Sequence, residues 1–209
     1  MSLLPFKKML KKTTLIIFPI LCFLFSCSST NIEKQILNDF IDEQNKNGRT
    51  IKVIVDKSYP RTKSLDYYIM AYEDRNIRMG DWIRVTPNGY PPYNWPIDIT
   101  VVKELKSKYK DDNTYYWKKK DFYRPKFKII SEYESRTSRN PIFEKYLFSS
   151  GLYISKPVVT LDNKYAFIFY SDFSVGTGGT AGRYEAALLE NVNGKWKIIA
   201  TYIDPNVIS

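Results

Sequence analysis

Apolar positions near the start of the chain first form an unbroken run and then recur at helical spacing. Residues 15–25 (LIIFPILCFLF) contain no charged or strongly polar side chain. A capping-box spacing follows, with Thr30 as the expected N-cap and Glu33 three residues later. The later apolar positions, and the glycine that ends the pattern, are Ile32, Ile36, Leu37, Phe40, Ile41 and Gly48. This spacing predicts an amphipathic helix over about 31–46.

The last part of the chain has the alternation and the turn residues that are typical of strands. We expect four strands, over 152–160, 165–173, 184–191 and 195–203. Asp162-Asn163 and Asn193-Gly194 stand where two-residue turns belong, and Asn-Gly is a strong hairpin signal. The pattern therefore predicts a four-strand C-terminal meander.

The turn at Asn193-Gly194 also fixes the expected register of the last hairpin. A type I′ turn places Glu190 opposite Lys197, and their face of the hairpin is the polar one. The opposite face, expected to contact the core, carries Ala187, Leu189, Trp196, Ile198 and Ala200. Strand 165–173 is apolar on both sides, which favours a central position in the sheet.

The middle of the chain has weaker signals. The expected elements are strands over 50–56, 65–72, 76–85 and 127–131 and a helix over 101–110. Residues 87–96 (PNGYPPYNWP) form a loop, because prolines lack the donor that a helix or a central strand requires. The fold predicted is α+β, with the N-terminal helix packed on an antiparallel sheet that ends in the C-terminal meander.

The composition removes most catalytic classes. The 209 residues include no histidine, which excludes a Ser-His-Asp triad, a Cys-His pair and an HExxH zinc site. Two cysteines cannot form a Cys-rich metal site or a disulfide framework. We therefore expect no metal and no cofactor, and favour a protein that is not an enzyme.

Carboxylates are the acid–base groups that remain. The sequence allows Glu132 and Glu134 to share a strand face, and Asp121 and Asp172 lie near apolar stretches. A glycosidase needs two carboxylates at a set separation, which a sequence alone does not show. Surface acids are the default interpretation, and no catalytic residue is predicted.

The glycine-rich stretch 174–182 (SVGTGGTAG) matches a loose GxGxxG/A pattern. A dinucleotide site would also need the stretch to open a helix inside a βαβ unit. Its position between two expected antiparallel strands favours a hairpin loop instead. A helix beginning at Arg183 would keep the phosphate-loop interpretation open.

The first residues have the layout of an export signal. Lys7, Lys8, Lys11 and Lys12 precede the apolar run, and no acid occurs among them. A basic start, a short apolar stretch and a small residue before a cut are typical of a secretory signal. A membrane-spanning helix needs about 20 apolar residues, which is more than this run supplies.

The run ends in Leu24-Phe25-Ser26-Cys27, which resembles the lipobox of bacterial lipoproteins. In that family the cysteine is acylated with fatty acids such as palmitate after a cut before it. The resemblance implies a signal peptide over 1–26, acylated Cys27 with a short tether over 27–31, and a single globular domain over 32–209. The protein would be held by its lipid on a membrane of the bacterial cell envelope, facing the periplasm or the cell exterior. The alternative is an ordinary secretory leader.

The C-terminal hairpins carry Asp-Asn-Lys-Tyr-Ala-Phe and later Asn-Gly-Lys-Trp-Lys. In this respect the chain resembles uncharacterised bacterial envelope lipoproteins, and also NTF2-like domains, which end in long curved strands with the same Gly-Lys-Trp turn. An NTF2-like cone is therefore the alternative fold.

Positive charge is concentrated between Lys103 and Lys128. This stretch holds ten Lys and Arg against four acids, interleaved with seven aromatic residues. The candidates for binding an anionic surface are Lys118, Lys119, Lys120, Arg124, Lys126 and Lys128. Such a mixture usually meets nucleic acid, but the expected export makes anionic lipid a nearer partner, and no nucleic acid is expected. In the alternative interpretation the aromatic rings fill the core and the lysines are a solvated face.

A second candidate surface is the proline-rich loop with Tyr90, Tyr93 and Trp95. Exposed rings on a rigid loop can stack on sugars, whereas the alternative is a lid that folds back on the core. The leading function is a lipid-anchored envelope lipoprotein with a non-catalytic binding domain. The alternatives are a carbohydrate-binding or carbohydrate-active envelope protein, bound to an envelope glycan, and an immunity or inhibitor lipoprotein with an unknown protein partner.

Overall fold

The computed structural model describes residues 31–48, 50–76, 83–86, 94–123, 125–137, 141–176 and 182–204. The leader and Cys27 therefore lie outside the described residues. The strands are β1 (Val53–Val55), β2 (Ile83–Val85), β3 (Lys128–Ile130), β4 (Ser150–Ile154), β5 (Val158–Val159), β6 (Tyr165–Ser174), β7 (Tyr184–Val192) and β8 (Lys195–Ile203). The helices are the N-terminal helix over 31–46, α2 (Thr62–Glu73), α3 (Ile99–Lys108), α4 (Glu132–Arg136) and α5 (Pro141–Tyr146), with short 3₁₀ turns η1 (Asp74–Asn76) and η2 (Lys119–Asp121).

The strands form one mixed sheet in the order β2-β8-β7-β6-β4-β1-β3, with β5 also paired to β6. The C-terminal strands pair antiparallel, and the predicted α+β class and meander are confirmed. Strand β1, however, runs parallel to both β3 and β4, so the sheet is not antiparallel throughout. The strand expected over 152–160 is interrupted before Pro157, which has no backbone N–H to donate to a ladder.

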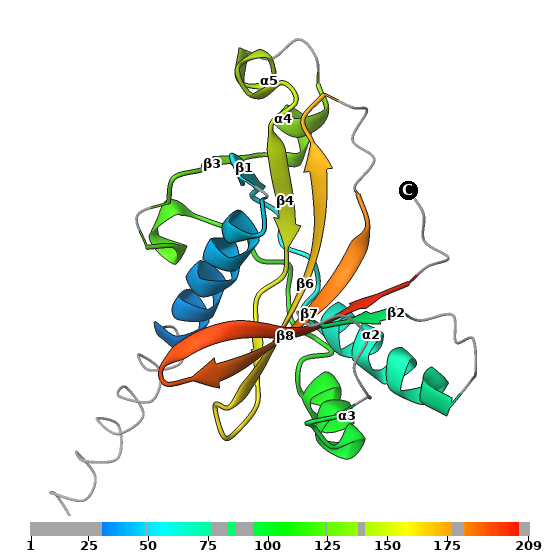
Figure 1. The fold of residues 1–209 in the computed structure, drawn as a ribbon. Coiled ribbons are helices and arrows are strands. Elements are labelled where there is room, and N and C mark those ends of the chain that lie inside the picture. Colours follow the sequence, from blue (N-terminus) through cyan, green and yellow to red (C-terminus); the bar gives the residue numbers. More distant parts are fainter. Residues whose placement is uncertain are drawn as a thin grey trace, which may run out of the picture.

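The N-terminal helix covers one face of the sheet, as predicted (Figure 1). Its apolar stripe packs against inward-facing residues of the central strands, among them Ile154, Ile168, Tyr170, Leu189 and Trp196. The helix also follows the part of β8 that β2 does not pair. There Asp39 Oδ2 accepts the N–H of Trp196 and Glu43 Oε2 accepts the N–H of Ile198, both at 2.9 Å. A helix rises about 6 Å over four residues and a strand rises about 6.6 Å over two. The spacing of the two carboxylates along the helix therefore matches the spacing of the two N–H groups along β8.

The other face of the sheet is covered by α2 and α3 (Figure 1). The prediction of a strand over 65–72 is therefore wrong, because these residues lie within α2. Its buried positions Leu65, Tyr68 and Ile69 have the spacing of one helix face. The Tyr and Ile content of this segment favours a strand locally, and packing against β6 and β8 overrides that preference. The helix expected over 101–110 is confirmed as α3, and the strand expected over 76–85 is described only as η1 and β2.

The last hairpin has the predicted register near its turn. Glu190 faces Lys197, and Asn193 and Gly194 have φ of 53° and 79°, as a type I′ turn requires. A bulge then shifts the pairing, so that Leu188 lies opposite Ala200. Ala200 consequently packs in the α2–α3 core rather than under the N-terminal helix, which corrects the predicted face.

Candidate functional site

The aromatic and basic residues expected to bind an anionic surface lie on one segment, 115–128, which we call the basic segment. Its buried side is aromatic: Trp117 and Phe122 are in the core under the N-terminal helix, and the rings of Phe122 and Phe127 lie 4.9 Å apart. Its outer side carries the exposed lysines 118, 119, 120, 126 and 128. Arg124 lies outside the described residues. Trp117, Phe122 and Phe127 therefore lie on the opposite side of the segment from its lysines.

Two further rings of the basic segment remain at the surface. Tyr116 is 54% exposed and Tyr123 is 51% exposed. The ammonium of Lys34 lies 4.5 Å from the centre of the Tyr123 ring. Exposed tyrosines beside lysines can contact both the charged and the apolar parts of an amphiphilic surface.

The basic segment is held against the first turns of the N-terminal helix. Lys34 Nζ donates to the carbonyl of Lys120 at 2.8 Å, and the N–H of Tyr123 donates to Asn38 Oδ1 at 2.8 Å. The Gln35 amide donates to the carbonyl of Gly194, which brings the tip of the β7–β8 hairpin to the same end of the helix. Lys120 and its neighbours Lys118 and Lys119 thus lie beside the first turns of the helix, whereas Lys128 pairs with Val53, which follows the other end of the helix.

Internal polar contacts shape the basic segment. Asp121 Oδ2 accepts the N–H of Lys118 at 2.8 Å and the phenol of Tyr115 at 2.9 Å. Burial, and second the hydrogen bond to Asp121, raise the pKa of Tyr115 to about 12. The phenol therefore stays a neutral donor at physiological pH, and the lysines that follow it project from an ordered turn.

A groove of about 670 Å³ lies between the basic segment and the N-terminal helix. Lys46, Lys52 and Lys126 line it together with the Tyr123 side chain, and Asp42 is the carboxylate among its described lining residues. Lys34, Lys46 and Lys52 were not among the predicted site residues. They are far from the charged stretch in sequence, and no local pattern indicated that they would face it.

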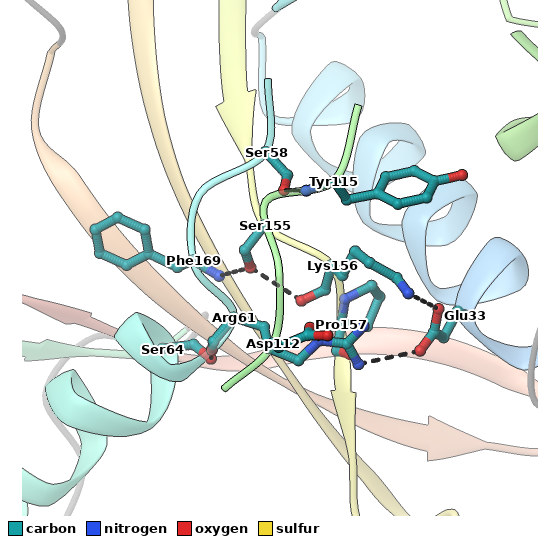
Figure 2. Close-up of polar contacts among 10 residues, drawn as sticks. All are labelled: Glu33, Ser58, Arg61, Ser64, Asp112, Tyr115, Ser155, Lys156, Pro157 and Phe169. Atoms are coloured by element: carbon teal, nitrogen blue, oxygen red, sulfur yellow. Dashed lines mark hydrogen bonds and ion pairs between the residues drawn. The ribbon is translucent and has the colours of Figure 1, made fainter. Parts of the chain in front are cut away.

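The start of the N-terminal helix is fastened by a buried arginine. Arg61 Nη1 donates to Glu33 Oε1 at 3.2 Å and to the carbonyl of Pro157 at 3.1 Å, and Arg61 Nε forms an ion pair with Asp112 Oδ2 at 2.5 Å. Lys156 Nζ reaches the other oxygen of Glu33 at 3.3 Å (Figure 2). These contacts connect the helix, α2, the chain after α3 and the link between β4 and β5. We interpret this cluster as structural, because its charged groups neutralise one another.

Two serines in the same region complete backbone hydrogen bonds where regular pairing stops. Ser155 Oγ accepts the N–H of Phe169 at 2.9 Å and donates to the carbonyl of Lys156 at 3.1 Å (Figure 2). Ser58 Oγ accepts the N–H of Tyr115 at 3.0 Å. These hydroxyls satisfy backbone groups and so have a structural role.

Trp95 is partly buried in the α2–α3 core. Its ring lies 5.3 Å from that of Tyr68 and stacks on Tyr202 with centroids 6.0 Å apart. The Arg84 guanidinium lies 5.2 Å from the same indole. Tyr90 and Tyr93 lie outside the described residues. Of the three rings predicted to form a sugar platform, the one described thus packs inward.

The carboxylates considered from the sequence have local partners. Glu132 and Glu134 lie in α4 rather than on a strand, which corrects the expectation of a shared strand face. Glu134 completes a capping box with Ser131, and Glu132 forms an ion pair with Lys57 at 3.6 Å.

The glycine-rich stretch connects β6 to β7, and residues 177–181 within it lie outside the described residues. Because β6 and β7 pair antiparallel, no βαβ unit surrounds the stretch. Residues 184–192 form strand β7, so the alternative of a helix beginning at Arg183 is wrong.

Within the described part of the chain, no helix is long and apolar enough to cross a membrane. The same residues contain no group of three or more potential metal ligands. Comparison of the whole chain with protein families, curated proteins and solved structures finds no match. Function is therefore inferred from the residues themselves.

Proposed function

We propose that the chain is a lipid-anchored envelope lipoprotein whose domain binds an anionic surface without catalysis. The observation that carries the proposal is the outward set of lysines on the basic segment, of which Lys118, Lys119 and Lys120 lie beside the first turns of the N-terminal helix. With a lipid on Cys27, the tether to the helix would span at most about 18 Å at roughly 3.5 Å per residue. Lys118, Lys119 and Lys120 would then lie near the membrane that holds the lipid.

Lysines 118, 119, 120, 126 and 128 are all exposed. A Lys or Arg at an anionic surface contributes about 1 kcal/mol. If only half of these lysines engage at once, the electrostatic contribution is about 2–3 kcal/mol, which would hold the domain itself against the membrane to which its lipid tethers it.

The surface contact is tested with a fragment, 28–209, that lacks the lipid. We expect it to bind vesicles containing an anionic phospholipid and to be released as salt rises, because screening weakens exposed charges. Replacing Lys118, Lys119 and Lys120 with Glu should remove most of this binding while the circular dichroism spectrum stays unchanged.

The matched control reverses three exposed lysines elsewhere, Lys63, Lys108 and Lys145. It has the same net charge as the first variant, so equal losses in both would show an effect of net charge alone. A fragment that ignores anionic vesicles even at low ionic strength would contradict the proposed surface.

The anchor is tested separately in cells. Labelled palmitate should be incorporated into the wild-type chain and lost in Cys27→Ala, and the variant should move from the membrane to the soluble fraction. Unchanged membrane partitioning of the variant, or a wild-type chain without label, would overturn the lipoprotein assignment whatever the vesicles show.

A further inference from the structure

The turn between β5 and β6 carries the most exposed of the large apolar side chains in the described part of the chain. Leu161 is 82% exposed, although it stands between β5 and the buried start of β6. A single exposed leucine is common at protein surfaces and does not by itself indicate a function. Two further features, the order of the turn and its position in the domain, distinguish this one.

Hydrogen bonds hold the turn in one shape. Asp162 Oδ1 accepts the hydroxyl of Thr160 at 2.5 Å and the N–H of Lys164 at 3.0 Å. The N–H of Asn163 donates to the carbonyl of Thr160 at 2.9 Å. Asn163 has a φ of 55°, in the left-handed region that asparagine adopts more readily than most residues. The Leu161 side chain is therefore presented to solvent by an ordered turn, and it would reach the core only if these contacts broke.

The turn lies toward the same end of the domain as the first turns of the N-terminal helix (Figure 1). The N–H of Asn191 donates to the carbonyl of Lys164 at 2.8 Å, which joins the turn to the end of β7. Asn191 Oδ1 accepts the N–H of Gly194 at 2.9 Å, and the carbonyl of Gly194 accepts the amide of Gln35. A chain of hydrogen bonds thus connects the turn that carries Leu161 to the part of the helix that follows the tether.

The charges near Leu161 balance. Lys164 and Lys195 are exposed on the two neighbouring turns. Asp162 follows Leu161 directly, and Glu190 Oε1 lies 3.9 Å from Lys164 Nζ. Two lysines thus stand beside two carboxylates. An attraction between this turn and a bilayer would therefore come from the leucine, whereas that of the basic segment comes from its lysines.

We propose that Leu161 inserts into the interfacial layer of the membrane that holds the protein, so that the β5–β6 turn and the basic segment contact the same bilayer. The inference rests on the proposed anchor and surface, and it adds an apolar contact to their electrostatic one. A leucine that moves from water into an apolar layer is stabilised in proportion to the area buried. The side chain is already exposed, so insertion needs no rearrangement of the domain.

The test uses the full chain, reconstituted into vesicles of phosphatidylcholine and phosphatidylglycerol, in which the N-terminal segment or its lipid holds the protein at the bilayer. A genetically encoded amino acid with a dansyl group replaces Leu161. We expect its emission to shift to shorter wavelength, because the dansyl group leaves water. A lipid with a spin label just below its headgroup should quench this emission.

Phe148 is the matched control, because it is exposed to a similar extent at the far end of β6. Its side chain is 73% exposed, and it stands just before β4, whose Ser150 pairs with Ser174 at the end of β6. The ten residues of β6 span about 30 Å at roughly 3.3 Å per residue. The same probe in place of Phe148 should therefore keep its emission wavelength in water and escape quenching.

A second measurement needs no substitution. In the full chain held in lipid nanodiscs, the spin-labelled lipid should broaden the methyl NMR signals of Leu161. The methyl signals of Leu147, which is 43% exposed and precedes Phe148, should stay sharp.

Two results would overturn the proposal: the probe at Leu161 keeps its emission in water, or the probes at Leu161 and Phe148 are quenched equally. Circular dichroism shows whether each substituted chain is folded, and if the Leu161 variant is not, the methyl signals decide. Binding of fragment 28–209 to anionic vesicles without quenching at Leu161 would remove the inserted turn and leave the basic surface. Quenching at Leu161 in a chain whose fragment ignores anionic vesicles would do the reverse.

Discussion

Replacing the buried Arg61 tests how firmly the N-terminal helix is fastened to the rest of the domain. The Arg61 side chain is 4% exposed, whereas its partners Glu33 and Asp112 are 24% and 37% exposed. Arg61→Met keeps most of the aliphatic stem and removes the charge. Arg61→Ala also removes the stem that lies against the Tyr109 ring, whose centre is 4.7 Å from the guanidinium carbon.

The expected loss follows from what each partner retains. Breaking a fully buried ion pair costs roughly 3–5 kcal/mol, because the remaining charge is left in an apolar environment. Here Glu33 keeps Lys156 at 3.3 Å, and Asp112 can be solvated again. The carbonyl of Pro157 loses a donor, which costs about 1–3 kcal/mol. We therefore expect the free energy of unfolding to fall by about 2 kcal/mol for Arg61→Met, and by about 1 kcal/mol more for Arg61→Ala.

Urea unfolding followed by circular dichroism measures these differences, provided that the slope with denaturant stays constant. Asp112→Asn is the milder comparison, since Arg61 then keeps Glu33, and it should lose about 1 kcal/mol or less. If Arg61→Met is as stable as wild type, or more stable, the desolvation of the arginine outweighs its contacts. The role given to this cluster would then be wrong.

Two further predictions concern the core. Trp196→Ala should lower the free energy of unfolding by about 3–5 kcal/mol in a urea titration, because the ring is 1% exposed. The control Lys195→Ala, at an exposed neighbour, should change it by less than about 0.5 kcal/mol. Similar effects for both variants would contradict the assigned packing. Burial raises the pKa of Tyr67, Tyr68 and Tyr115 to about 12, above about 10 in an unfolded chain. The stability that these phenols contribute is thus present below pH 10 and lost between about pH 10 and 12. NMR signals assigned to the Tyr67, Tyr68 and Tyr115 rings should show ionisation only as the protein unfolds, and ionisation of these three in the folded protein near about pH 10 would contradict this order.

Local chemistry explains which parts of the fold could be predicted. The Asn193-Gly194 turn sets the register near it, because few residue pairs adopt positive φ at both positions so readily. The pairing of β1 with β3 and β4 joins segments about 75 and 100 residues apart, and nothing within β1 encodes its partners. The bulge that moves Ala200 is equally invisible in the sequence, because Ile198, Ile199 and Ala200 are consecutive apolar residues and either register buries apolar side chains there.

The candidate site also has one part that the sequence indicates and another that only the fold brings to it. The charge run marks the basic segment in the sequence, but its partners Lys34 and Asn38 come from the helix.

The N-terminal helix connects the proposed anchor to two cavities of the domain. One side of it, with Asn38 and Asp42, lines the groove of the basic segment. Another side, with Gln44, lines a cavity of about 630 Å³ against the sheet, and Lys46 lines both. Asp39 and Glu43 fix the helix to the backbone of β8, so a shift of the helix along its axis would break both of these hydrogen bonds together. The groove and the cavity therefore have walls on one helix, and the attachment of that helix to the sheet determines the shape of each.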